Sequence, residues 1–277
     1  MDADALRAEI ERLSPWLHAI ELAPGVSTAA VGQPSGSGEE AVGEPYSPDM
    51  MTERLIKNLY AAGMEGRSFL DCGCNAGGHM FAAARMGASR GFGFDARQHW
   101  IDQANFLARH LPSENVSFTT CELGDLPGLR LEPFDVTLFS GLFYHLPDPV
   151  AGLKIAADLT RELIVVNTSV LPRIEKGLVL SQESDSHVLS GIDGLAWLPT
   201  GPEVVQEILA WCGFPHSRID MDWAPPRPAG WRRIQVLGAR EAITFVDYDR
   251  VRPDASRPAR LSLKRRLLRR LAARLAR

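Results

Sequence analysis

The stretch Ser68-Phe-Leu-Asp-Cys-Gly-Cys-Asn-Ala-Gly-Gly-His79 decides the fold of this chain. An apolar strand ends there in a glycine-rich turn, and the residues after the turn have the composition of a helix. A second apolar run, residues 90–95, ends in Asp95. Strand, glycine turn, helix, strand and terminal carboxylate together indicate a site for a nucleotide-type cofactor. Glycine lets the backbone approach a ligand where a Cβ atom would collide, and the carboxylate can accept both hydroxyls of a ribose.

The spacing within the turn distinguishes between cofactors. A dinucleotide site has Gly-x-Gly-x-x-Gly before a helix N-terminus that faces a pyrophosphate. Here the pattern is Asp71-x-Gly73-x-Asn75-x-Gly77, and an acidic residue before the first glycine would repel a pyrophosphate. The same carboxylate suits the ammonium and sulfonium charges of S-adenosylmethionine (SAM). A glycine turn in another kind of α/β protein is the alternative interpretation.

At these residues the chain resembles class I SAM-dependent methyltransferases. Their first motif is Asp/Glu-x-Gly-x-Gly-x-Gly, and Asn75 stands here in place of the middle glycine. Asn tolerates the left-handed backbone region better than most residues. The resemblance covers about residues 46–240. It implies an α/β, Rossmann-like fold, in which a seven-stranded, mostly parallel sheet with an antiparallel last strand carries helices on both faces.

The Asp-x-Gly-Cys-Asn-x-Gly and Gly-Leu-Phe-Tyr-His-Leu segments also resemble one subgroup of that family. It contains the tRNA wobble-uridine carboxymethyltransferase and sugar or natural-product hydroxyl methyltransferases. In the tRNA enzyme a basic residue follows the Tyr-His pair, where this chain has Leu146. That difference weakens the transfer of its carboxylated cofactor and its tRNA substrate to this chain.

Hydrophobic periodicity predicts alternating strands and helices. We divide the chain into an N-terminal helix and flexible lid (1–45), a methyltransferase domain (46–245) and a basic amphipathic tail (246–277). The first helix is expected over residues 2–23, and an insertion without clear periodicity over about 171–200. Further strands are expected at 67–72, 90–95, 116–121, 134–140, 163–167, 217–222 and 232–237. Further helices are expected from Ser47 to Tyr60 and at 77–87, around 100–107, at 149–159 and at 203–211.

Composition and charge narrow the class of protein. A chain of 277 residues with 45% hydrophobic and 23% charged residues is typical of a globular protein. No apolar run approaches the roughly 20 residues that span a bilayer, and the acidic start predicts no secretory signal. The four cysteines lack zinc-ligand spacing, which favours a reducing, cytoplasmic location.

The net charge of −4 is distributed unevenly. Residues 260–277 carry eight Lys and Arg and no acid, which leaves −12 on residues 1–259. An acidic body disfavours a nucleic-acid substrate. The basic tail is interpreted as a helix that is solvated, docks a partner or lies on an anionic membrane. A homodimer is a further open possibility.

Residues at the ends of the predicted strands are candidates for binding SAM. By the resemblance, Asp71 and Gly73 hold its methionine end, Asn75, Gly77 and Gly78 line the turn, and Asp95 accepts the ribose hydroxyls. After the third strand, Glu122 and Leu123 match the position near the adenine ring. Asp125 is the nearby competitor there, and we interpret it as a turn residue. Ser140 is placed under the transferring methyl group.

The segment Ser140-Gly-Leu-Phe-Tyr-His-Leu-Pro-Asp-Pro149 supplies the candidate catalytic residues Tyr144 and His145. It resembles the fourth motif of the family. A hydroxyl attacks a sulfonium methyl well only when a base removes its proton, and histidine titrates near neutrality. The alternative is that His145 caps the following helix or packs beside Tyr144.

The insertion contains Gln182-Glu-Ser-Asp-Ser-His187, which alternates acids and a histidine. In an extended segment Glu183, Asp185 and His187 share one face and could hold Mg²⁺. We favour a polar loop over a metal site as the interpretation of this cluster.

The sequence therefore predicts a SAM-dependent O-methyltransferase that acts on a hydroxyl of a sugar, polysaccharide or other small natural product. Two alternatives stay open. One is a tRNA wobble-uridine (carboxy)methyltransferase that uses the basic tail to hold RNA. The other is a non-catalytic SAM-binding protein.

Overall fold

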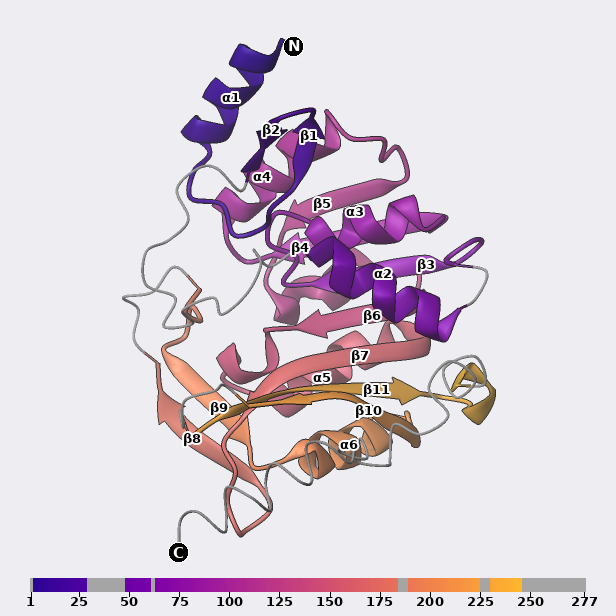
Figure 1. The fold of residues 1–277 in the computed structure, drawn as a ribbon. Coiled ribbons are helices and arrows are strands. Elements are labelled where there is room, and N and C mark those ends of the chain that lie inside the picture. The colour runs from indigo at the N-terminus through magenta and orange to yellow at the C-terminus, as the bar shows by residue number, and fades with distance from the viewer. Residues whose placement is uncertain (1, 29–47, 61–62, 184–188, 225–229, 246–277) are drawn as a thin grey trace, which may run out of the picture.

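The computed structural model describes residues 2–28, 48–60, 63–183, 189–224 and 230–245. Within these ranges one seven-stranded sheet carries helices on both faces, which confirms the predicted fold (Figure 1). The basic tail and the segment 29–47 lie outside the described residues, so what the sequence predicts for them stays a prediction.

The sheet has the strand order β10-β11-β7-β6-β3-β4-β5. The strands are β3 (Ser68–Cys72), β4 (Arg90–Asp95), β5 (Val116–Thr120), β6 (Phe134–Ser140), β7 (Thr160–Val170), β10 (His216–Trp223) and β11 (Arg232–Ala239). The strands from β7 to β5 are parallel, and β11 runs antiparallel to both of its neighbours. Parallel strands buried on both faces are nearly continuous apolar runs, which is why the sequence located them.

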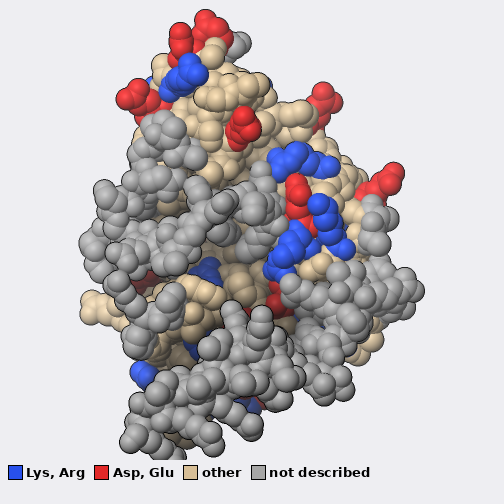
Figure 2. All heavy atoms as spheres, in the orientation of Figure 1, with Lys and Arg blue, Asp and Glu red and all other residues tan. Residues whose placement is uncertain are grey.

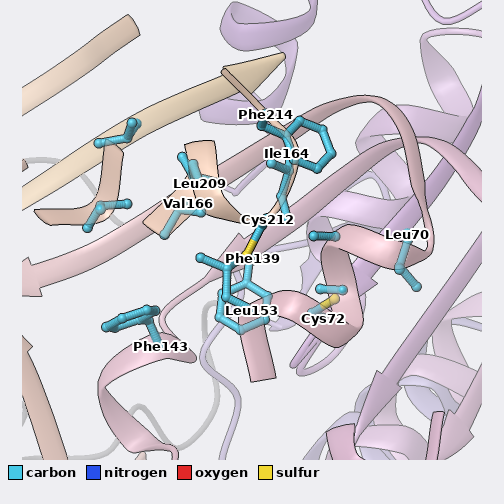
Figure 3. Close-up of a cluster of buried hydrophobic side chains, with 14 of the residues drawn as sticks. Leu70, Cys72, Phe139, Phe143, Leu153, Ile164, Val166, Leu209, Cys212 and Phe214 are labelled. Carbon is cyan, nitrogen blue, oxygen red and sulfur yellow. The ribbon is translucent and has the colours of Figure 1, made fainter. Parts of the chain in front are cut away.

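Two groups of helices cover the two faces of the sheet. The helices are α2 (Pro48–Leu59), α3 (Gly78–Arg85), α4 (Gln98–Ala108), α5 (Pro149–Asp158) and α6 (Pro202–Trp211), with short 3-10 helices η2 (Leu123–Leu129), η3 (Phe143–His145) and η4 (Ala242–Phe245). On one face, α2 and α3 pack on the sheet through Leu55 and Met80. On the other face, Leu153 of α5 and Leu209 of α6 meet Phe139 and Val166 in the larger core (Figure 3). Burial of these side chains is the main source of stability for the sheet that positions the site.

The N-terminal helix is shorter than the sequence predicts. Helix α1 spans Ala3–Arg12, whereas the expectation was 2–23. Pro15 follows soon after and cannot continue a helix, and the Trp16 indole donates back to the Ile10 carbonyl at 2.7 Å. A small hairpin of β1 (Glu21–Ala23) and β2 (Val26–Ser27) follows (Figure 1). Residues 2–28 therefore fold back on the domain, with Trp16 fully buried.

The insertion also differs from the prediction. It contains an antiparallel hairpin, β8 (Leu178–Gln182) and β9 (Leu195–Pro199), outside the main sheet. Neither strand was predicted, because partly exposed side chains on both faces of β8 leave no clear alternation. Strand β7 likewise continues to Val170, three residues beyond the predicted end.

Charged side chains are mixed on the face that Figure 2 shows. Acidic side chains gather around basic ones at the top of that view, where α1 lies, and basic side chains gather at the right of the view with acidic ones among them. On the described part of this face there is no broad basic surface of the kind that would follow a nucleic-acid backbone. Among the described residues, no helix combines the length and apolarity that crossing a bilayer requires.

Candidate active site

The turn between β3 and α3 has the backbone that its glycines predict. Gly73, Asn75 and Gly77 all have positive φ, at 70°, 49° and 78°. A Cβ atom on Gly77 would lie 2.7 Å from the Phe118 ring, so glycine is required there for space as well as for φ. Asn75 adopts the left-handed region and accepts from the Ala76 amide through its own side chain at 2.7 Å. The departure from the family motif at Asn75 is therefore compatible with the turn.

Asp95 closes the turn from the end of β4. Its two carboxylate oxygens accept from the backbone amides of Asn75 and Arg97, at 3.1 and 3.0 Å. Burial raises the pKa of this carboxyl, and those two hydrogen bonds oppose the shift. A carboxylate has about four acceptor positions, so it can still receive ribose hydroxyls. Asp95 thus links the glycine turn to the neighbouring strand at the predicted place.

Asp71 is the acidic residue that precedes the first glycine. Its side chain is buried, and Oδ2 has no hydrogen-bond partner among the described residues. Burial, and then the nearby charge of Asp95, raise the pKa of Asp71 to about 8. A buried acceptor without a donor is costly and fits a cationic ligand. The ammonium of SAM is such a cation, so the residues present here fit this cofactor.

The remaining predicted cofactor residues lie at the same edge of the sheet. Ser140 ends β6, and the Gly78 amide begins α3. Leu123 is buried against α5, whereas Glu122 and Asp125 beside it are exposed at the start of η2. The structure thus brings the turn, Asp95 and Ser140 together, while Leu123 contributes mainly to the core.

His18 is a neighbour of the turn that sequence reasoning missed. Its Nδ1 atom accepts from the Gly78 amide at 3.2 Å, at the N-terminus of α3. Its ring lies 5.8 Å from that of His79, whose Nδ1 is bonded to Thr52. Burial, and then the charge of His79, lower the pKa of His18 to about 3. The N-terminal segment therefore contributes a neutral histidine to the support of the cofactor turn.

This histidine should make the protein sensitive to acid. Below pH 6.5 the unfolded chain binds a proton at His18 that the folded chain does not, so stability falls as pH falls. The slope is about 1.4 kcal/mol per pH unit, which amounts to about 2 kcal/mol between pH 6.5 and 5. His18→Asn, whose Oδ1 can accept from Gly78 and does not titrate, should lose less stability over this range. Urea unfolding at pH 7 and pH 5 measures both proteins, and equal losses would contradict the assignment.

The segment after β6 places Tyr144 and His145 in η3. Gly141 turns the chain with φ of 70°, and the two rings that follow lie 4.2 Å apart. Tyr144 Oη accepts from Arg233 of β11 at 2.9 Å, a contact that sequence reasoning did not anticipate. Asp148 then caps α5 by accepting from the Ala151 amide at 3.0 Å. The helix cap that His145 could have provided is thus occupied by Asp148.

His145 pairs with Glu183 of the insertion. The ring atom Nδ1 lies 2.8 Å from the carboxylate, which also accepts from the Gly191 amide at 2.9 Å. Burial lowers the pKa of His145, and the Glu183 carboxylate opposes that shift. A carboxylate on Nδ1 fixes the tautomer that leaves Nε2 unprotonated. The pair therefore has the arrangement of a histidine base held by an acid.

The predicted metal set is only partly described. Asp185 and His187 lie outside the described residues, and Glu183 is bonded to His145 and Gly191. Among residues that the structure describes, no three acids, cysteines or histidines are grouped as metal ligands.

Comparison with known families agrees with this geometry. The family described as "Methyltransferase domain" matches residues 64–190, a range that begins before the glycine turn and ends at the residue before Gly191. Residues 64–190 are therefore similar to a methyltransferase domain, and the turn and carboxylates described above lie within that range. The crystal structure of the N-terminal domain of EvdMO1, in the presence of SAH and D-fucose, is similar to it at a TM-score of 0.69 and 19% identity. That similarity covers 87% of this chain and 98% of the EvdMO1 domain, and it shows a shared fold.

Curated relatives of the methyltransferase domain are enzymes named tRNA U34 carboxymethyltransferase. The one from Alteromonas mediterranea is 25% identical over 163 residues, 56% of this chain and 47% of the relative. The one from Hydrogenovibrio crunogenus is 28% identical over 190 residues, 64% of this chain and 53% of the relative. The chain thus spans about half the length of the curated relatives it matches.

Proposed function

We propose that this methyltransferase domain transfers the SAM methyl group to a hydroxyl of a sugar, polysaccharide or other small natural product. The observation that carries the proposal is the His145–Glu183 pair, at 2.8 Å, beside the end of β6. Alcohols need a base because their protons leave only as the new bond forms. A neutral amine would not need one, so an oriented histidine favours an oxygen nucleophile over a nitrogen one.

The chain's own residues divide the work of this reaction. SAM supplies a methyl group already activated on a sulfonium sulfur. As the acceptor oxygen bonds to the methyl carbon and the carbon–sulfur bond breaks, the acceptor proton passes to Nε2 of His145. Glu183 keeps Nδ1 protonated and stabilises the imidazolium that results. Tyr144 and Arg233 present donors at the same mouth and can orient a hydroxylated acceptor.

Support for a sugar acceptor comes from one structural neighbour. The EvdMO1 domain was crystallised in the presence of D-fucose, and its fold matches most of this chain. The acidic balance of residues 1–259 also favours a small or uncharged acceptor over a polyanion. Mg²⁺ is a further element of the proposal, because Glu183, Asp185 and His187 could bind it in a rearranged insertion.

A second candidate is carboxymethyl transfer to tRNA. The relatives carry that name, and Arg233 with Tyr144 offers a donor pair that suits a carboxylate on the transferred group. Leu146, where the tRNA enzyme has a basic residue, and the mixed charge of Figure 2 speak against it.

Transfer of labelled methyl from SAM separates these candidates. The purified chain is incubated with a soluble carbohydrate and small-molecule extract and, separately, with bulk tRNA, each with and without EDTA. We expect label in the small-molecule fraction, stable to mild base as an ether would be. Loss of that label with EDTA would support Mg²⁺ bound by the insertion. Label that persists with EDTA would leave proton removal to His145. Label in tRNA alone would overturn the sugar proposal.

A further inference from the structure

A row of polar side chains crosses the face of the sheet that α2 covers. Asn167 on β7 and Gln235 on β11 are direct cross-strand partners, and both are buried. Asn167 also pairs in register with Ser140 of β6. The row therefore connects the edge of the sheet to the strand end where methyl transfer is proposed. Buried polar side chains in an apolar sheet need a reason, since each costs free energy unless it is bonded.

The hydrogen bonds along this row run in one direction. Arg233 Nε donates to Asn167 Oδ1 at 2.6 Å, and Asn167 Nδ2 donates to Gln235 Oε1 at 3.1 Å. Gln235 Nε2 then donates to the Asp220 carboxylate at 2.8 Å. A guanidinium can only donate and a carboxylate can only accept, so both ends fix the same orientation of the two amides. The row joins a cation at the active site to an anion at the sheet edge.

Two features of the fold hold Asp220 at the end of this row. The pairing of β10 with β11 shifts between Ile219 and Met221, so Asp220 is the extra residue of a β-bulge. A bulge redirects a side chain, and the side chain of Asp220 is fully buried. Arg54 of α2 donates to the same carboxylate at 2.9 Å. The bulge thus places the Asp220 carboxylate where it accepts from both Arg54 and Gln235.

At the other end of the row, Arg233 lies against the turn at Gly141, between β6 and Tyr144. A Cβ atom on Gly141 would lie 3.5 Å from its Nη2 atom, and Nη1 donates to Tyr144 Oη at 2.9 Å and to Ser169 Oγ at 3.3 Å. With Nε bonded to Asn167, the guanidinium plane has a single orientation. Reorienting the Asn167 amide would therefore turn the Arg233 donors that lie beside Tyr144.

We propose that Asp220 and Gln235 are positioning residues. The hydrogen bond between them, which we call the junction, sets how Arg233 presents its guanidinium beside Tyr144. The inference rests on the proposed function only where it predicts a change in affinity for the acceptor. The junction itself is a property of the free protein.

The test exchanges donor and acceptor at the junction. Gln235→Glu sets one carboxylate against another, so repulsion removes the donor to Asp220 and pushes the acceptor at position 235 away from Asn167. Adding Asp220→Asn returns a donor, so the double variant can rebuild every bond of the row with the same net charge. Asp220→Asn alone is the milder variant, since its amide can turn either way. Gln206→Glu is the matched control, because Gln206 bonds Ser217 on the same edge strand at 2.8 Å, outside the row.

Two measurements on these variants test the proposal. The first is the nitrogen-15 NMR signal of the Arg233 Nε–H group in the free protein, assigned by its absence in Arg233→Lys. It should exchange slowly in the wild type, the control and the double variant, and rapidly in Gln235→Glu. The second is methyl transfer to a dilution series of the carbohydrate extract. Gln235→Glu should raise the apparent KM by about tenfold with less change in kcat, and the double variant should recover most of it.

The outcomes separate this inference from the proposed function. A protected signal in Gln235→Glu, or no recovery of the signal in the double variant, overturns the junction even if sugars are methylated. The expected NMR pattern without any carbohydrate methylation supports the junction and overturns the sugar proposal. The expected NMR pattern with an unchanged KM shows a structural role only, and overturns positioning. If Gln235→Glu does not fold, Asp220→Asn against the double variant gives the same comparison with a smaller effect.

Discussion

Replacing His145 with Asn should lower kcat for methyl transfer by about 10²–10⁴-fold. The amide nitrogen of Asn takes the place of Nδ1 and can still donate to Glu183, whereas the base atom Nε2 is lost. The dissociation constant of SAH should stay nearly unchanged, because His145 is not among the residues assigned to the cofactor. Single-turnover transfer of labelled methyl and calorimetric titration of SAH measure the two quantities.

The dependence of activity on pH should show that His145 acts in its neutral form. Burial lowers the pKa of His145 below its ordinary value, and only the neutral imidazole can take a proton. Activity should therefore rise with pH on the acid side of neutrality and be level at pH 7. Glu183→Gln removes the charge that raises this pKa, so the acid limb should move to lower pH while the plateau falls. A limb that moves to higher pH would contradict the pairing.

The same variants distinguish the kind of acceptor. An amine acceptor attacks as the neutral form and does not need His145 in the transition state. A loss smaller than about tenfold in His145→Asn would then return His145 to a packing role beside Tyr144. Both the hydroxyl assignment and the base would be wrong in that case.

Much of the fold could be predicted because its determinants are local. Each buried parallel strand is an apolar run, and the turn after β3 needs glycine or Asn at three positions of positive φ. The start of α5 at Pro149 follows from the Asp148 cap, which the sequence displays directly. The end of α1 also has a local determinant, because Pro15 cannot continue a helix and could have been used to predict where α1 ends.

The acceptor side of the site depends on contacts that no local pattern encodes. Glu183 meets His145 across 38 residues, and Arg233 meets Tyr144 across 89. The metal interpretation of Glu183 arose because its neighbours in sequence are acids and a histidine, while its observed partner comes from another element. One signal was available: Asn167 and Ser169 on β7, and Arg233 and Gln235 on β11, place polar residues at alternate positions in apolar strands. Such a pattern predicts a polar stripe on one face of a sheet.

Asp71→Asn should weaken SAM binding by about 10–100-fold. A hydrogen bond between charged groups contributes about 1.5–3 kcal/mol, and about 1.4 kcal/mol is one factor of ten in affinity. The pKa of about 8 adds a pH dependence, because most of the free protein carries a proton on Asp71 at neutral pH. An ammonium favours the carboxylate, so binding should release that proton and tighten about tenfold per pH unit up to pH 8. Calorimetry in buffers of different ionisation enthalpy measures the proton, and Asp71→Asn should show neither the release nor the slope.

The same substitution should stabilise the free protein. A folded pKa raised above the unfolded value contributes stability that is complete below about pH 4 and is lost as pH rises through 8. Asn has no proton to lose, so Asp71→Asn should gain in unfolding free energy over the wild type between pH 6 and 8. Urea unfolding without and with saturating SAH measures both effects, and the variant should be the more stable protein only without ligand. If it were less stable at pH 8 in the absence of ligand, Asp71 would be a structural residue, because a carboxylate kept for a cation is costly only while that cation is absent.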